Sequence, residues 1–333
     1  MSAKILGVIK MSLESKIWGT RGSMAQPHRD YMEYGGNTSS VTVRTSENSL
    51  LFLDAGTGIQ YAAKEELKTL AEKVYLCLSH THADHVMGLG MSALPWVTFR
   101  PEYKNKQAQL IGPEGVVHGL QRFYDGELNK NQYTKCMANE NWPVAATDNP
   151  DVKPNMPGIT LGYVGKPLEP LENEVCTIDE KTSMKVMRGS HPVSGESLLY
   201  RIENGGKSLV YAVDNEFDFL NGGVPNKDAE AFEEKYVRFV KGADVLIADA
   251  QYTKDEYIGK KPSNVQGFGH AYIEQVIDLA AKAGVKKVMP FHHHTAHNDA
   301  MMREIEQSAK AYAKEKGYNL EVEFAKEGMV INL

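Results

Sequence analysis

Residues 79–88 read S-H-T-H-A-D-H-V-M-G and hold three histidines and an aspartate, His80, His82, Asp84 and His85. Imidazole and carboxylate groups are the usual protein ligands of zinc and similar divalent ions. His80 and His82 alternate, so in an extended segment both imidazoles project to one side and can share an ion. Asp84 and His85 follow where a helix is expected to begin, and they point elsewhere, toward a second ion. The cluster therefore predicts half of a site for two metal ions.

Two ligands per ion are too few, because a tetrahedral or five-coordinate ion needs further ligands from other loops. The later part of the chain offers His191, Asp214, His270 and the run His292, His293 and His294. An aspartate between two ions can bridge them with its two oxygens, and Asp214 suits that role.

Several apolar segments end directly in a polar residue that could bind metal or catalyse a reaction, namely Asp54, His80, Asp214, Asp249 and His292. A buried strand fixes the position of its last residue, while the loop that follows is free to open toward a substrate. We therefore expect these strand ends to converge on one site.

Strand-like and helix-like segments alternate along most of the chain, which favours an α/β layered fold. We expect strands at 39–45, 49–56, 73–80, 197–204, 208–214, 244–250, 286–292 and 320–325, and helices at about 59–72, 227–241, 270–283 and 298–316. The region from about 100 to 185 is rich in proline, glycine, asparagine and lysine. We interpret it as an elaborated insertion within a single domain that spans residues 1–333.

The composition of the chain indicates which partners and which cellular location are expected. The chain has 333 residues, 42% of them hydrophobic, and a net charge of −6 at pH 7, with acidic and basic residues interspersed. Without a basic stripe, long nucleic acid is not the expected partner. Three irregularly spaced cysteines fit neither a disulfide framework nor a cysteine zinc site, which favours a reducing, cytoplasmic setting. The apolar run near the start of the sequence is too short for a signal peptide, and no segment approaches the ~20 apolar residues that a membrane span requires, so we expect neither.

The order of the motifs is similar to that of the metallo-β-lactamase-fold hydrolases, in particular the branch with PhnP-like cyclic phosphodiesterases and long-form transfer RNA 3′-processing endonucleases. Matching segments run through nearly the whole chain: WGTRGS, YGGNTSSVTV, LDAGTG, SHTHADH, SHP, YAVDNE, DAQYTKDEY and GFGHAYIEQVIDLAAKAGVKKVMPFHH. The resemblance implies an αββα sandwich, in which helices flank two mixed β-sheets. It also implies a homodimer.

The same resemblance implies two divalent ions, zinc or alternatively manganese. Carried over residue by residue, it assigns His80, His82 and His191 to one ion, Asp84, His85 and His292 to the other, and Asp214 to a bridge between them. Asp54 matches a residue that supports the motif loop through hydrogen bonds without binding metal. His293, His294 and His297 are interpreted as structural or solvent-facing groups.

Catalytic roles follow from the resemblance as well. Two ions would lower the pKa of a bridging water from ~15.7 toward ~7 and neutralise charge in the transition state. Asp84 could orient the hydroxide and take its proton. His270 matches a histidine beside the scissile phosphate that can protonate the leaving oxygen, and Glu216 could hold its ring. Two alternatives stay open: His270 could cap a helix, and Glu216 could be a solvated turn acid.

Four aromatic residues lie in or near the DAQY and GFGH segments, namely Tyr252, Tyr257, Phe268 and Tyr272. We interpret them mainly as core packing rather than as platforms for base stacking, although one or two of them could line the pocket.

The expected function is that of a phosphodiesterase acting on a small cyclic or linear nucleotide or sugar phosphodiester. The alternatives are a transfer RNA 3′-processing endonuclease, a thioester or lactone hydrolase of the same fold, and a metal-binding regulatory protein with little turnover. Only 22 residues separate His191 from Asp214. That segment is too short for the long flexible arm that the processing endonucleases typically insert there.

Overall fold

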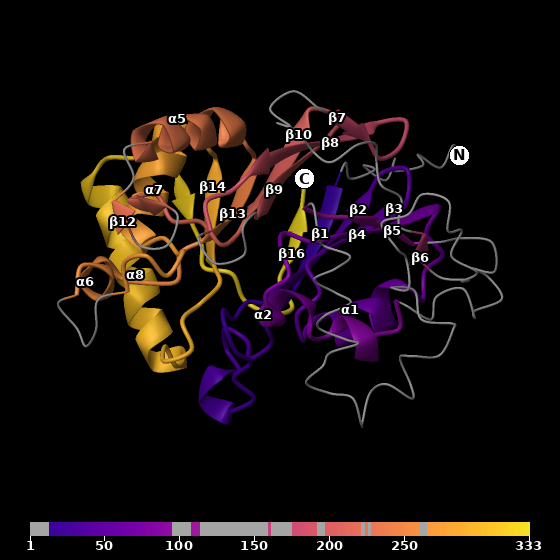
Figure 1. Cartoon of the computed structure of the whole chain (residues 1–333), viewed down its shortest axis with the longest axis horizontal. Helices are drawn as coiled ribbons and strands as arrows, with labels where there is room; N and C mark the ends of the chain where they lie inside the picture. The colour runs from indigo at the N-terminus through magenta and orange to yellow at the C-terminus, as the bar shows by residue number, and fades with distance from the viewer. Residues whose placement is uncertain are drawn as a thin grey trace, which may run out of the picture.

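The computed structural model of the chain describes residues 13–94, 108–113, 159–160, 175–191, 197–220, 224–225, 228–259 and 265–333. Two seven-stranded sheets form its centre, and helices lie along their outer sides (Figure 1). The expected αββα sandwich of two mixed sheets is confirmed.

The first sheet consists of β1 (Leu13–Gly19), β2 (Ser40–Thr45), β3 (Ser49–Leu53), β4 (Lys73–Cys77), β5 (Ala108–Ile111), β6 (Ile159–Thr160) and β16 (Val330–Asn332). Its strand order is β16-β1-β2-β3-β4-β5-β6. The pairs from β16 to β3 are antiparallel, and those from β3 to β6 are parallel. Because β3 and β4 run in parallel, Asp54 and the segment after Cys77 emerge at the same edge.

The second sheet consists of β7 (Val175–Thr177), β8 (Thr182–Arg188), β9 (Leu198–Asn204), β10 (Lys207–Ala212), β13 (Val245–Asp249), β14 (Lys287–Phe291) and β15 (Glu321–Val322). Its order is β15-β14-β13-β10-β9-β8-β7, with parallel pairing from β10 to β15 and antiparallel pairing from β7 to β10. The parallel strands β10, β13 and β14 therefore bring Asp214, Asp249 and His292 to one edge. A separate small sheet pairs β11 (Phe219–Leu220) with β12 (Val224–Pro225).

The core follows the two-residue alternation of the strands. Val41, Val43, Leu51 and Leu53 of the first sheet share one buried cluster with Leu209, Tyr211, Val245 and Ile247 of the second. Leu50 and Phe52, on the opposite face of β3, join α1 (Ile59–Glu66) in a second cluster. Val210 and Leu246 join α5 (Ala229–Val240), α7 (Ile273–Lys282) and α8 (Asp299–Glu315) in a third cluster.

Shorter helical segments lie in the loops: η1 (Arg29–Tyr31), α2 (Ala83–Val86), η2 (Leu89–Met91) and α6 (Lys254–Tyr257). Local capping fixes two of the helix starts. The Asn298 side chain accepts a hydrogen bond from the Met301 N–H before α8, and Thr253 and Glu256 form a capping box at α6. In the described part of the chain, no helix has the length and apolarity to cross a membrane.

The expected elements agree with the structure apart from their ends. The helix expected to reach residue 72 stops at Glu66, where bonds from Lys68 N to Glu65 O and from Thr69 N to Glu66 O tighten the last turn. Within the region interpreted as an insertion, β5 and β6 extend the first sheet, and β7 and β8 extend the second. Residues 100–107, 114–158 and 161–174 of that region lie outside the described residues.

Candidate metal centre

The expected strand-end residues Asp54, His80, Asp214, Asp249 and His292 are all buried and lie around one site. At three of them, Asp54, Asp214 and His292, the chain adopts left-handed backbone angles, with φ of 60°, 53° and 62°. Such a conformation costs a non-glycine residue about 1–3 kcal/mol. The strand ends are therefore locally strained where their side chains enter the site.

One cluster contains four ligand atoms: Asp84 Oδ2, His85 Nε2, His292 Nε2 and Asp214 Oδ1. His292 Nε2 lies 3.2 Å from His85 Nε2, 3.1 Å from Asp84 Oδ2 and 3.3 Å from Asp214 Oδ1. His85 Nε2 lies 3.3 Å from each of the two carboxylate oxygens. A tetrahedral zinc ion with metal–nitrogen bonds of about 2.0–2.1 Å requires ligand atoms about 3.3 Å apart. Five of the six separations among these atoms, all except that between Asp84 and Asp214, therefore fit the ligand shell of one ion.

A second cluster uses the other oxygen of Asp214. Its Oδ2 atom lies 3.5 Å from His80 Nε2 and 3.7 Å from His191 Nε2, which in turn lies 3.1 Å from His82 Nδ1. Asp214 thus presents one oxygen to each cluster, the arrangement that a bridging aspartate needs.

Unpaired polar atoms also indicate a cation. Among the described residues, His80 Nε2 and Asp214 Oδ1 are buried without any hydrogen-bond partner. Buried polar atoms almost always have a partner in folded proteins. Since both atoms face the other ligand atoms of the clusters, bound metal ions would account for them.

Two of the histidines are oriented by hydrogen bonds at Nδ1, the ring nitrogen that does not face the other ligand atoms. His85 Nδ1 donates to Asp54 Oδ2 at 2.8 Å, and His191 Nδ1 donates to the Gly269 carbonyl at 2.9 Å. A proton on Nδ1 leaves the Nε2 lone pair free for a metal. Asp54 also accepts hydrogen bonds from Ser79 N, Ser79 Oγ and the Tyr211 hydroxyl, at 2.7–2.8 Å. It therefore supports the motif loop as the resemblance implied.

Burial and charge set the protonation of the site. Burial lowers the pKa of His80 and His82 and lowers that of His191 to about 4, so these rings are neutral, the form that binds metal. Burial also opposes a charge on His85, but the carboxylates around it, foremost Asp214, raise its pKa well above the ordinary value.

The segment after β1 reaches the site, which the sequence did not indicate. The Ser23 N–H donates to Asp84 Oδ2 at 2.8 Å. A Cβ atom on Gly22 would lie 2.5 Å from Nδ1 of His292. This close approach explains why glycine occupies position 22.

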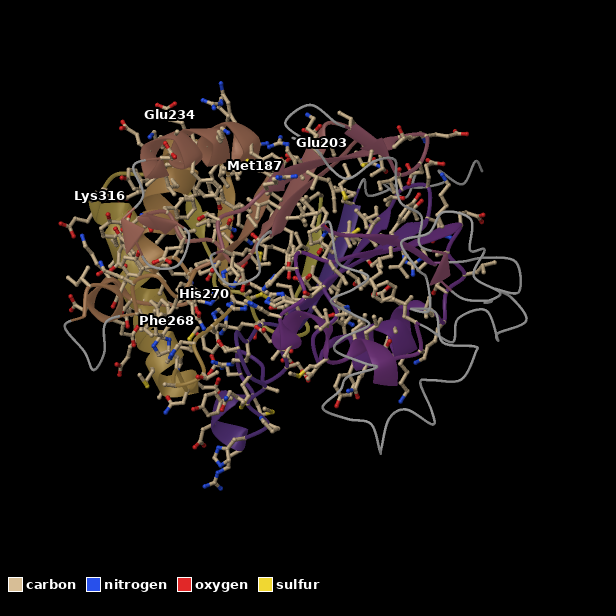
Figure 2. All side chains as sticks on the ribbon, viewed as in Figure 1. Met187, Glu203, Glu234, Phe268, His270 and Lys316 are labelled. Carbon is tan, nitrogen blue, oxygen red and sulfur yellow. The ribbon has the colours of Figure 1, made fainter. Side chains whose placement is uncertain are left out.

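His270, labelled in Figure 2, precedes α7, and its ring lies close to a histidine of each cluster, His191 and His292. Its Nδ1 atom lies 2.8 Å from Asp249 Oδ2, and its ring stacks on His292 with centroids 4.9 Å apart. Burial opposes protonation, but Asp249 foremost raises the pKa of His270 to about 9. The helix-cap alternative is wrong, because α7 begins after Tyr272 and no side chain caps it.

The expectation that Glu216 holds the His270 ring is wrong. The alternative that Glu216 is a solvated turn acid is wrong as well. Its buried carboxylate accepts hydrogen bonds from Gly267 N at 2.7 Å, Gly269 N at 2.8 Å and the Tyr257 hydroxyl at 2.7 Å. Burial raises the pKa of Glu216, and these donors partly oppose that shift. Glu216 therefore fixes the backbone that carries His270, whereas Asp249, the last residue of β13, orients the ring.

The remaining histidines of the last loop have structural contacts. His293 Nε2 donates to the Ala325 carbonyl, and His297 Nε2 lies 2.8 Å from Glu256 Oε1. Arg21, which the sequence did not single out, is buried and donates to the carbonyls of Gly35 and His297. It joins the segment after β1 to the loop after β14.

The aromatic residues near the site divide into two groups. Tyr252 and Tyr257 are buried, and Tyr272 packs against them half-buried. Phe268 is 59% exposed, so for this residue the expectation of core packing is wrong.

The chain is similar in sequence to a known domain family and to curated proteins. A model of the β-lactamase superfamily domain matches residues 51–293. Ribonuclease Z of Clostridium tetani is 23% identical over 309 residues, which cover 86% of this chain and 90% of that protein. Ribonuclease Z of Picrophilus torridus is 23% identical over 300 residues, with 84% and 85% covered.

Solved structures share the fold at lower identity. A diphosphatase from the PhnP family matches with a TM-score of 0.62 and 14% identity, over 96% of this chain and 98% of that one. The short form of human tRNase Z matches with a TM-score of 0.55 and 17% identity, over 96% and 98%.

Proposed function

Since the chain belongs to the metallo-β-lactamase superfamily, we propose that it is a phosphodiesterase with a two-metal centre. The family and the curated relatives indicate a metal-dependent hydrolase. The single observation that carries the finer proposal is the position of Asp214, which presents one oxygen to each of two ligand clusters beside the pair of His270 and Asp249.

The first ion would be held by His80, His82, His191 and Asp214, and the second by Asp84, His85, His292 and Asp214. Imidazole and carboxylate donors suit zinc, with manganese as the alternative. When bound, two divalent ions would activate a water molecule and offset the charge that the phosphoryl oxygens gain.

The chain's own groups supply proton transfer and orientation. Asp249 accepts a hydrogen bond from Nδ1 of His270, which leaves Nε2 of that ring to face a substrate. His270 would donate its proton to the leaving oxygen, and the Asp84 carboxylate would orient the attacking water and take its proton. The Ser23 N–H fixes the position of the Asp84 carboxylate for that role.

Cleavage of precursor transfer RNA is the second candidate. The curated relatives named Ribonuclease Z align with most of this chain and with most of their own length. Their name weakens the expectation that long nucleic acid is an unlikely partner. Against this candidate, strands β9 and β10 form most of the short segment between His191 and Asp214.

A turnover screen of the zinc-loaded and manganese-loaded protein tests the proposal. The substrates are cyclic nucleotides, a cyclic ribose phosphate, a transfer RNA precursor and a thioester. Hydrolysis of the small phosphodiesters is expected. Cleavage of the precursor alone would favour the endonuclease, turnover of the thioester alone would contradict both candidates, and bound metal without turnover would indicate a regulatory protein.

His82→Ala should abolish that turnover and lower the bound metal measured by elemental analysis. The matched control is His28→Ala, which removes a histidine with a side chain that is 61% exposed and should change neither quantity. Normal turnover and metal content in His82→Ala would contradict the two-metal centre. The cytoplasmic location and the homodimer stay predictions, the latter checked by the mass of the protein in solution.

A further inference from the structure

Phe268 is displayed to solvent from a loop in which the backbone is firmly held. The flanking residues Gly267 and Gly269 have φ of 85° and 89°, left-handed angles that glycine adopts without strain. Their N–H groups donate to the two oxygens of Glu216, and Phe268 N donates to the Val265 carbonyl at 3.2 Å. The exposure of Phe268 therefore belongs to an ordered loop conformation.

Its exposure is unusual for its residue type. Among the described residues, every other phenylalanine with a placed side chain is buried or half-buried, whereas Phe268 is 59% exposed. Burying a phenylalanine side chain is worth about 1.5–3 kcal/mol relative to leaving it in water. A ligand that covers the ring would recover that free energy.

The loop also belongs to the metal centre. Gly269 O accepts the hydrogen bond that orients His191, and His270 follows directly, with its ring 5.2 Å from that of His191. Phe268 is therefore two residues from the proposed proton donor, and Figure 2 shows both residues in the same part of the molecule. A group attached to the leaving oxygen of a substrate would lie on this side of the site.

We propose that Phe268 stacks on the nucleobase of a nucleotide whose phosphodiester is bound at the metal centre. The inference rests on the proposed phosphodiesterase function and adds the substrate class. A phenylalanine ring offers no hydrogen bond and recognises the face of a planar ring, which every base has. The site should therefore distinguish nucleotides from sugar phosphates and discriminate little among the bases.

Binding to the metal-loaded protein tests this inference with two ligands that differ in the base, adenosine 5′-monophosphate and ribose 5-phosphate. Stacking of a base on an aromatic side chain is worth about 1–3 kcal/mol, which corresponds to a change in Kd of about 5- to 150-fold. By calorimetry, Phe268→Ala should weaken binding of the nucleotide by this factor and leave binding of the sugar phosphate unchanged.

Three further variants make the result specific. Phe268→Trp should retain the nucleotide affinity, whereas Phe268→Leu, which is apolar without an aromatic face, should not. Tyr61→Ala removes a 57% exposed aromatic side chain on α1 and should change neither affinity. All variants should keep the bound metal and melting temperature of the wild type, because the replaced side chains are exposed.

Equal effects of Phe268→Ala on the two ligands, or none on either, would overturn the stacking role. Hydrolysis of bis(p-nitrophenyl) phosphate by the wild-type protein separates this failure from that of the proposed function. Hydrolysis together with an unaltered nucleotide affinity in Phe268→Ala would refute the inference alone. Absence of hydrolysis of any phosphodiester would refute the proposed function on which it rests.

Discussion

Replacement of Glu216 by glutamine should destabilise the protein and slow the reaction, although Glu216 contacts neither a ligand atom nor the His270 ring. The carboxylate is buried and accepts three hydrogen bonds, from Gly267 N, Gly269 N and the Tyr257 hydroxyl. Glutamine keeps one acceptor oxygen and turns the other position into an N–H₂ donor. If the oxygen serves Gly267 and Tyr257, the new donor faces the Gly269 N–H, and that hydrogen bond is lost.

The loss can be worked out from the contacts. A hydrogen bond to a charged group contributes about 1.5–3 kcal/mol, and a neutral one contributes about 0.5–1.5 kcal/mol. One charged bond disappears, and two become neutral and lose about 1–1.5 kcal/mol each, so the free energy of unfolding should fall by about 3.5–6 kcal/mol. Because Gly269 also orients His191 and precedes His270, kcat should fall about 10-fold or more.

Urea denaturation followed by circular dichroism measures the first quantity, and phosphodiester turnover with the metal content measures the second. The matched control is Glu234→Gln on α5, the same chemical change at a surface glutamate that pairs with Arg238 at 3.6 Å (Figure 2). An exposed pair of this kind contributes about 0.3–0.5 kcal/mol. The reasoning is refuted if Glu216→Gln unfolds at the same urea concentration as Glu234→Gln.

Three other variants test the site and its surroundings. Asp249→Asn should leave the metal content unchanged and lower kcat about 10- to 100-fold, because a neutral amide orients and charges His270 less well; an unchanged kcat would show that the pair is not needed. Gly22→Ala should weaken metal binding in a competition with a chelating indicator, since its Cβ would lie 2.5 Å from His292 Nδ1, and unaltered affinity would mean that the segment moves freely. Burial opposes a negative charge on Glu256, but His297, whose Nε2 atom lies 2.8 Å from Glu256 Oε1, lowers the pKa of Glu256 from 4.5 to about 2. The contribution of the Glu256 carboxylate to stability is therefore full above pH 4.5 and lost as the pH falls toward 2. The difference in melting temperature between wild type and Glu256→Gln should shrink over that range. A constant difference would contradict the assignment.

The layered fold and the clustering of the ligand residues could be predicted because both follow local patterns. Alternating apolar residues define strands such as β2 and β3, and the polar residue that follows a buried strand is visible in the sequence. The spacing of His80, His82, Asp84 and His85 predicts half of the candidate metal centre without knowledge of the partner strands.

The assignments that failed depend on how distant segments meet. Glu216 is close to Asp214 in the chain, which favoured it as the partner of His270, yet Asp249 reaches the ring from the end of β13. The exposure of Phe268 depends on the left-handed glycines around it and on the carboxylate that binds them. No periodicity in the sequence encodes either contact.

The left-handed residues have a consequence for protein engineering. Asp54, Asp214 and His292 occupy a backbone conformation that glycine adopts without steric strain. A library selected only for thermal tolerance of the metal-free protein would gain backbone stability from glycine at Asp214 and His292, and it would discard activity at the same positions. Stabilising designs should therefore hold these positions constant and introduce changes elsewhere, because the backbone strain at these residues lies in the candidate metal centre.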